Sequence, residues 1–368
     1  MTNASKSYAH DVLGEHPFAL GLFGSNVSGG ITMTGAEGAF DLSWESTSNL
    51  AKQADDLGLD LLVPVARWRG YGGRSNPNGV TYETFTWAAG IAAVTKRIVV
   101  AATAHAPALH PLVVAKQTAT IDAISGGRFA LNAVMGWFTP ELDMFGIATK
   151  EHEDRYRFGD EWMDVISRLW STSTPFDHDG ASFHLKGAIS EPRPSARPLV
   201  LNAGASPAGI EFTARHADVN FATLMNVGQG RQLVDNITKV AETHGRPVRV
   251  MTYGTVIIGD TEADAQRRYQ EILEHGDIEA ARNFMHYLGL NSSSFEAHIA
   301  AALEEHFVSS GGGLPIVGSA EQVADRLTEL YEAGVTGFMM GGVPYSGMLD
   351  RFGAEVLPLL RERGLRTA

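Results

Sequence analysis

Short apolar runs alternate with longer amphipathic segments along most of this chain. Apolar and β-branched runs predict eight strands, at residues 18–23, 61–65, 98–103, 128–134, 199–203, 219–223, 248–258 and 337–341. Segments with helical spacing follow them, for example at residues 43–57, 82–94, 111–124, 154–170, 207–216, 229–243, 261–275 and 345–363. Because parallel strands need helical crossovers, this alternation predicts an α/β fold, a single (β/α)8 (TIM) barrel.

Two segments are longer than the connections that such a barrel needs. Residues 171–198, before the fifth strand, are rich in Pro, Ser and Asp and predict an ordered insertion. Residues 276–314, between the seventh and eighth strands, contain the polar run 291–294 and three glycines at 311–313. A long insertion at a barrel rim is either a lid or a feature without a role in the site, and the sequence leaves both open.

Composition and charge limit the partners. The chain has 29 basic and 42 acidic residues, a net charge of −13, which disfavours nucleic acid and anionic membrane as partners. The absence of cysteine excludes a disulfide scaffold, a thiolate metal site and a cysteine nucleophile. Residues 1–17 form a polar lead without a signal-peptide pattern, and no apolar run reaches about 18 residues. We therefore expect a cytoplasmic protein with one barrel domain over residues 18–368.

Several enzyme classes lack their motifs in this sequence. It contains no GxGxxG that opens a helix, no GxxxxGK[ST], no HExxH and no GxSxG. Rossmann dehydrogenases, P-loop NTPases, zincins and α/β-hydrolases are therefore disfavoured. The run Glu151-His152-Glu153-Asp154 has the composition of a metal site. Consecutive residues point in different directions, so we interpret it as a solvated helix start and predict no metal.

Polar residues at the carboxyl ends of barrel strands are the functional candidates. Thr103 ends the third predicted strand, Asn132 lies near the end of the fourth, and residues 26–30 (Asn-Val-Ser-Gly-Gly) follow the first. Because an unpaired buried amide costs roughly 1–3 kcal/mol, Asn132 must have partners, either barrel backbone or a ligand. Its place near the strand end favours a ligand. Thr103 alone is equally consistent with a structural role, since threonine is common in strands.

A helix start follows the fifth predicted strand. Ser206, followed by proline, has the N-cap pattern, and the free amides of a helix N-terminus can also bind phosphate. Arg155 and Tyr156 could add a cation and a hydroxyl to that phosphate, or could be surface residues of a helix. His105 and His110 follow the third strand and are either structural histidines or substrate contacts.

Six short segments of the sequence occur in a characteristic order and spacing. They are residues 119–122 (Ala-Thr-Ile-Asp), 125–128 (Ser-Gly-Gly-Arg), 131–138 (Leu-Asn-Ala-Val-Met-Gly-Trp-Phe), 151–156 (Glu-His-Glu-Asp-Arg-Tyr), 204–206 (Gly-Ala-Ser) and 317–319 (Val-Gly-Ser). In order and spacing they resemble the luciferase-like flavin-dependent monooxygenases. The resemblance extends from Phe18 to Leu360, essentially the whole chain.

Other segments resemble particular branches of that family. Residues 26–30, 115–117 and 136–138 resemble dimethyl sulfone monooxygenases, whereas residues 67–73 and 209–215 resemble pyrimidine monooxygenases; alkanesulfonate monooxygenases belong to the same branch. The resemblance implies that the protein oxygenates a small molecule with O2 and reduced FMN (FMNH2). A separate NAD(P)H:flavin reductase would supply the reduced FMN. The substrate classes that it implies are a sulfone, a sulfonate or an N-heterocycle.

The resemblance also implies roles for individual residues. Ala66 and Arg67 would lie beside the isoalloxazine, with Asn132 and Glu141 nearby. Thr103 and Asn132 would be the catalytic pair at flavin N5, with a flavin peroxide, formed at N5 or at C4a, as the reactive species. The residues implied to surround the flavin phosphate are Arg155, Tyr156 and Ser206. The residues expected to contact substrate are Ser28, Trp68, Arg69, His105, Trp137 and Phe138.

Two alternative functions remain open, and an oligomeric state is expected. A deazaflavin-dependent oxidoreductase on the same fold and a non-catalytic flavin-binding protein are the alternatives. The pairing of Thr103 with Asn132 and the polar loop 26–30 favour oxygen chemistry over both. The family resemblance implies a homodimer or homotetramer, and the apolar segment 85–94 would otherwise expose apolar surface.

Overall fold

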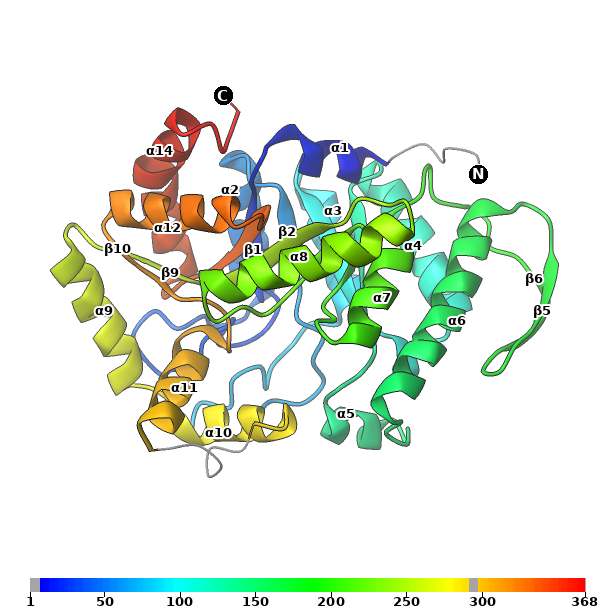
Figure 1. The fold of residues 1–368 in the computed structure, drawn as a ribbon, viewed down its shortest axis with the longest axis horizontal. Coiled ribbons are helices and arrows are strands. Elements are labelled where there is room, and N and C mark those ends of the chain that lie inside the picture. Colours follow the sequence, from blue (N-terminus) through cyan, green and yellow to red (C-terminus); the bar gives the residue numbers. More distant parts are fainter. Residues whose placement is uncertain (1–6, 291–296, 368) are drawn as a thin grey trace.

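The computed structural model describes residues 7–290 and 297–367. Its parallel strands form a closed ring, with helices around it (Figure 1). The ring consists, in order, of β1 (Ala19–Phe23), β2 (Leu61–Val63), β3 (Val99–His105), β4 (Phe129–Val134), β7 (Leu199–Asn202), β8 (Val219–Phe221), β9 (Arg249–Ile258) and β11 (Gly337–Gly341). Parallel pairing of β11 with β1 closes it. The predicted single (β/α)8 barrel is confirmed, and each of the eight predicted strands is present.

Helices cover the outside of the ring. They are α2 (Trp44–Asp56), α3 (Thr84–Val94), α4 (Pro111–Ser125), α6 (His152–Ser171), α7 (Pro207–His216), α8 (Val227–Thr243), α9 (Glu262–Glu274), α12 (Ala320–Glu332), α13 (Tyr345–Arg351) and α14 (Leu357–Glu362). Within the described ranges, each helix is too short or too polar to cross a membrane. The predicted last helix is divided, because a π-helical turn, Phe352–Val356, separates α13 from α14.

Both faces of the strands are buried, which explains their continuous apolar sequences. In β3, Val99 and Ala101 belong to the cluster inside the ring, whereas Val100 and Ala102 pack against the outer helices. One strand was not predicted from the sequence, β10 (Ile316–Gly318), which has three residues and pairs with the end of β9. The helix that follows it, α12, was not predicted either.

The two predicted insertions have different structures. Residues 171–198 contain an antiparallel hairpin, β5 (Phe176–Asp179) and β6 (His184–Ala188), at the edge of the molecule (Figure 1). The second insertion contains α10 (Ile278–Tyr287) and α11 (Ala297–Ser310), which lie with α5 (Thr139–Met144) at the carboxyl end of the barrel (Figure 1). Its polar run, Asn291 to Ser294, lies outside the described residues. Helices α10 and α11 share a separate apolar cluster with Met33, Tyr71 and Phe138.

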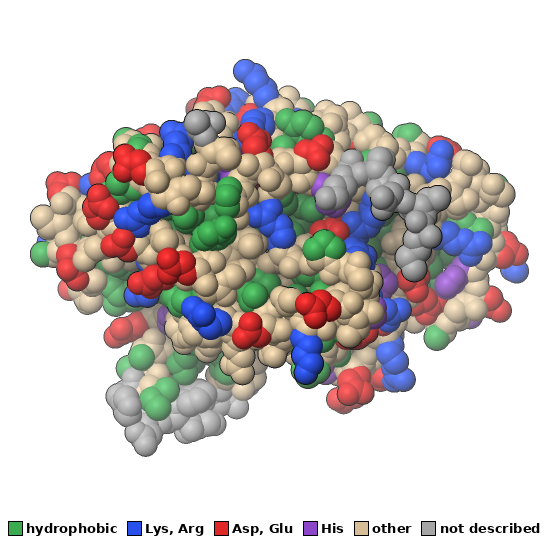
Figure 2. Space-filling view, turned by 45° about the horizontal axis from the view of Figure 1, so that its top comes forward, with side chains coloured by type: hydrophobic (Ala, Val, Ile, Leu, Met, Phe, Trp, Pro, Cys, Tyr) green, Lys and Arg blue, Asp and Glu red, His purple; other side chains and the backbone are tan. Residues whose placement is uncertain are grey.

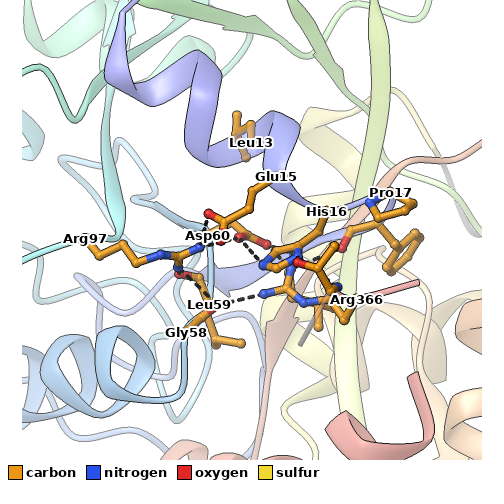
Figure 3. A network of polar contacts seen from close by, with 12 residues as sticks. Leu13, Glu15, His16, Pro17, Gly58, Leu59, Asp60, Arg97 and Arg366 are labelled. Carbon is orange, nitrogen blue, oxygen red and sulfur yellow. Dashed lines mark hydrogen bonds and ion pairs between the residues drawn. The ribbon is translucent and has the colours of Figure 1, made fainter. Parts of the chain in front are cut away.

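The opposite, amino end of the barrel is closed by both ends of the chain. Helix α1 (Tyr8–Glu15) buries Ala9, Val12 and Leu13 against the ring interior. Beside it, the fully buried carboxylate of Asp60 accepts the Leu20 N–H at 2.8 Å and pairs with Arg366 (Figure 3). Closure of this end leaves the carboxyl end of the barrel for ligands.

The large apolar side chains at the start and centre of α3 are buried within the single chain. Phe85, Trp87, Ala88 and Ile91 all belong to the main core, so this helix does not supply the exposed surface that was expected to drive oligomerisation. On the face that Figure 2 shows, acidic and basic side chains are interspersed and apolar side chains occur in small groups. The homo-oligomer therefore stays a prediction that rests on the family resemblance.

Candidate active site

The carboxyl ends of the strands surround a cavity of about 290 Å³, close to the lower end of the roughly 300–1,000 Å³ typical of small-molecule pockets. Its walls come from strand ends, from the loops around residues 30–33 and 64–78, and from the second insertion through Phe284, Leu288 and Phe307. Six of the predicted site residues line it: Ala66, Arg67, Thr103, His105, Asn132 and Trp137.

Thr103 and Asn132 form a hydrogen-bonded pair in the cavity wall. They are directly paired in the register of β3 and β4. Asn132 Nδ2 donates to Thr103 Oγ1 at 3.1 Å, and Thr103 Oγ1 donates to the Pro64 carbonyl at 2.6 Å. Asn132 Oδ1 is buried and has no hydrogen-bond partner among the described residues. Since a buried amide oxygen normally has a partner, the pair offers an acceptor to an N–H of a ligand in the cavity.

Arg67 lies within an aromatic cage. Its guanidinium carbon is 5.2, 5.1 and 4.9 Å from the ring centres of Tyr71, Trp137 and Phe138. Its Nη1 donates to Glu141 Oε2 at 3.2 Å, while its Nε is buried without a partner among the described residues. Burial raises the pKa of Tyr71 to about 12, so its phenol is neutral at physiological pH.

Glu141, at the start of α5, holds the chain segment that follows β2. It is 1% exposed, and its Oε1 accepts the backbone N–H groups of Trp68 at 2.6 Å and Arg69 at 3.2 Å. Together with the Arg67 contact, these bonds occupy both carboxylate oxygens. Glu141 does not line the cavity; it holds the side chain of Arg67, which does, and the backbone of the two residues that follow Arg67.

Four of the six predicted substrate contacts lie outside the lining of the main cavity. Trp68 is 49% exposed, and its ring packs edge-on against Phe145. Ser28 Oγ accepts the Val80 N–H at 3.1 Å, and Phe138 is buried beneath Arg67. Arg69 contributes its backbone to the Glu141 contact. His105 and Trp137 are the two that reach the cavity.

The two histidines after β3 have different surroundings. His105 is 6% exposed in the cavity wall, with Nδ1 3.5 Å from Glu141 Oε2. Burial and then the Arg67 cation lower the pKa of His105 to about 3, so its imidazole is neutral at physiological pH. His110 is exposed, and its Nδ1 accepts the Leu112 N–H at 3.2 Å at the start of α4. His110 therefore has a helix-capping role.

Acidification should destabilise the protein through His105. Its pKa is about 3 in the folded chain and 6.5 in a model peptide, so between these values only the unfolded chain carries the extra proton. Stability is therefore lost as the pH falls from 6.5 towards 3, by about 2 kcal/mol at pH 5. In urea unfolding, His105→Gln should lose about 2 kcal/mol less than wild type between pH 7.5 and 5, while His110→Gln should follow wild type. Equal losses in all three proteins would contradict this.

The three predicted phosphate contacts lie together where α6 and α7 pack side by side (Figure 1). Ser206 Oγ caps α7 by accepting the Gly209 N–H at 3.1 Å. His152 connects Ser206 with Arg155, since its Nε2 is 2.7 Å from Ser206 Oγ and its Nδ1 is 3.1 Å from Arg155 Nη2. Burial raises the pKa of Tyr156, and a hydrogen bond to Ser206 acts in the opposite direction.

Several residues of this site were not predicted from the sequence. His152 was interpreted as part of a solvated helix start, yet it contacts Ser206. Tyr253 and Thr223 line the cavity, and Tyr253 Oη donates to the Gly311 carbonyl at 3.1 Å and lies 3.2 Å from Thr223 Oγ1. Thr223 ends the sixth predicted strand, so the strand-end rule that selected Thr103 would also have selected it. Within the described ranges, no group of three or more potential ligands is arranged to hold a metal.

Comparison with known proteins gives this site its family. Residues 19–337 match the family described as luciferase-like monooxygenase, and the chain belongs to that family. The predicted class of enzyme, a flavin-dependent monooxygenase, is confirmed by this match and by the relatives of the chain.

Two relatives represent the two branches that the sequence segments resemble. The pyrimidine monooxygenase RutA of Acinetobacter baylyi is 30% identical over 335 residues, 87% of this chain and 89% of that protein. The FMNH(2)-dependent dimethylsulfone monooxygenase of Pseudomonas fluorescens is 30% identical over 343 residues, 92% of this chain and 93% of that protein. Among solved structures, a riboflavin lyase (RcaE) has the same fold, with a TM-score of 0.83 at 23% identity over 95% of this chain and 92% of that chain.

Proposed function

We propose that this chain binds reduced FMN delivered by a separate NAD(P)H:flavin reductase and uses O2 to oxygenate a small, uncharged organic molecule. The observation that carries the proposal is the unpaired, buried Asn132 Oδ1 beside Thr103, at the strand ends of a barrel of this family. The dependence of the dimethylsulfone relative on FMNH2 supports a flavin that arrives already reduced.

The residues present fit a flavin mononucleotide. Asn132 Oδ1 would accept an N–H of the reduced ring, with Ala66 and Arg67 beside the same cavity. The N-terminus of α7, with Ser206 and Arg155, would hold the phosphate. Bound reduced flavin would supply the electrons that activate O2. The chain would orient the ring, hold oxygen beside Thr103 and exclude water from the aromatic cavity.

The electrostatics of the cavity favour an uncharged substrate. Among the described residues that line it, Arg67 is the only lysine or arginine, and none is aspartate or glutamate. Glu141 already neutralises Arg67, and His105 is uncharged at physiological pH. An anionic sulfonate would lose hydration there without a free cation, whereas a neutral sulfone or N-heterocycle would need only hydrogen bonds. We therefore propose one of these two neutral classes.

One assay tests cofactor supply and substrate class together. Purified protein, FMN, NADH and O2 are incubated with dimethylsulfone, a pyrimidine or an alkanesulfonate, with and without an unrelated flavin reductase. We expect oxygenated product from a neutral compound only when the reductase is present, and none from the sulfonate. Rapid NADH consumption without the reductase would overturn the two-component proposal. Turnover of the sulfonate alone would overturn the neutral-substrate proposal.

A further inference from the structure

Three buried polar side chains lie beneath the loop that precedes α7. Asn202 ends β7, Asn220 is its parallel partner in β8, and Thr213 lies on α7. Their exposed fractions are 2%, 0% and 0%. Thr213 Oγ1 donates to Asn202 Oδ1 at 3.1 Å and accepts from Asn220 Nδ2 at 3.2 Å. The three side chains therefore form one hydrogen-bonded unit, the Asn-Thr-Asn triad.

The triad holds the backbone of Gly204 from both sides. The Gly204 N–H donates to Asn202 Oδ1 at 2.8 Å, and its carbonyl accepts from Asn220 Nδ2 at 2.8 Å. A side chain at this position would place its Cβ 2.5 Å from Tyr156 Oη and 2.6 Å from Gly209 Cα. The close approach requires glycine, and the triad satisfies its polar groups. Because Gly204 is held in place, the peptide units that lead from it to Ser206 and to the first turn of α7 are positioned as well.

The triad also reaches the strand that carries Asn132. Asn202 Nδ2 donates to the carbonyl of Ala133, the next residue along β4, at 2.7 Å. One amide side chain thus connects the loop before α7 to the wall of the cavity. None of the three triad residues lines the cavity. They act through the backbone they hold and are positioning residues.

We propose that the Asn-Thr-Asn triad positions the phosphate-binding loop, residues 204–206, relative to Asn132, and so sets the affinity for the phosphate of FMN. This inference rests on the proposed function. Apolar residues in place of the triad would leave two buried backbone groups of Gly204 without partners. The connected network instead gives the loop one conformation, because each bond constrains the others, although Asn220 Oδ1 itself has no partner among the described residues.

Thr213→Val tests the triad with little change in side-chain shape. It removes two hydrogen bonds of the unit without adding charge near the phosphate. Titrations of the full chain with oxidised FMN and with riboflavin should show FMN affinity lowered roughly tenfold and riboflavin affinity by less than about twofold. Asn220→Ala should have the same selective effect, and Thr213→Ser should restore FMN affinity.

The matched control is Thr95→Val. Thr95 is also buried, and its hydroxyl bonds to Ile91 and Arg128 at the amino end of the barrel. It should leave the ratio of the two affinities unchanged, even where it lowers the free energy of unfolding. If Thr213→Val lowered the affinities for FMN and riboflavin equally, or lowered neither, the proposed role of the triad would be overturned, but the proposed function would not. A wild-type protein that binds FMN no more tightly than riboflavin would overturn the phosphate site and the proposed function with it.

Discussion

Glu141→Ala is expected to lower the free energy of unfolding by about 3–5 kcal/mol. The carboxylate and its partner Arg67 are 1% and 5% exposed, so removing one leaves a buried, unpaired cation. The same change leaves the backbone N–H groups of Trp68 and Arg69 without their acceptor. Each loss alone is costly in a buried site, and here they fall together. Urea unfolding at pH 7.5 measures the effect.

A double substitution separates the charge from the backbone contacts. Arg67→Met with Glu141→Ala removes the unpaired cation but not the two unsatisfied amides, so the pair should cost less than the sum of the single changes. Glu141→Gln keeps an acceptor for the amides and should be milder than Glu141→Ala. A loss below about 1 kcal/mol for Glu141→Ala would show that water replaces the carboxylate and that Glu141 does not fix this segment.

The fold could be predicted because the strands of the ring are buried on both faces. Continuous apolar runs such as that of β3 differ clearly from the amphipathic helices between them. The helix α1 was missed because Ala9, Val12 and Leu13 are few among polar residues. The helical spacing of these three residues becomes informative only when the barrel interior that they cover is known. The strand β10, at three residues, is too short to give a pattern.

The contact between Thr103 and Asn132 could be predicted because neighbouring parallel strands place their carboxyl ends side by side. Thr103 and Asn132 each lie towards the end of a predicted strand, and neighbouring strands bring such ends together. The role of Glu141 was not predictable, because its partners are backbone amides 72 and 73 residues away. His152 meets Ser206 across 54 residues, and only the packing of α6 on α7 brings them into contact. The order of residue types along the sequence does not indicate which distant groups a side chain will contact.

Asn132→Ala is expected to lower the rate of substrate oxygenation roughly 10²–10³-fold at saturating reduced FMN. The substitution removes the unpaired buried acceptor and the bond to Thr103 in one step. FMN affinity should fall no more than about tenfold, because the proposed phosphate contacts at Ser206 and Arg155 lie on other elements. Single-turnover kinetics measures the rate, and flavin titration measures the affinity.

Thr103→Val tests whether oxygenation needs both Thr103 and Asn132 or Asn132 alone. It keeps the side-chain volume but removes the acceptor for Asn132 Nδ2 and the bond to Pro64, so the Asn132 amide loses its fixed orientation. The rate should fall in the same direction as for Asn132→Ala, by roughly tenfold, with FMN affinity close to that of wild type. Wild-type rates in both variants at saturating reduced FMN would show that the chemistry lies elsewhere. The neutral His105, in the same cavity wall, would then be the residue to replace next.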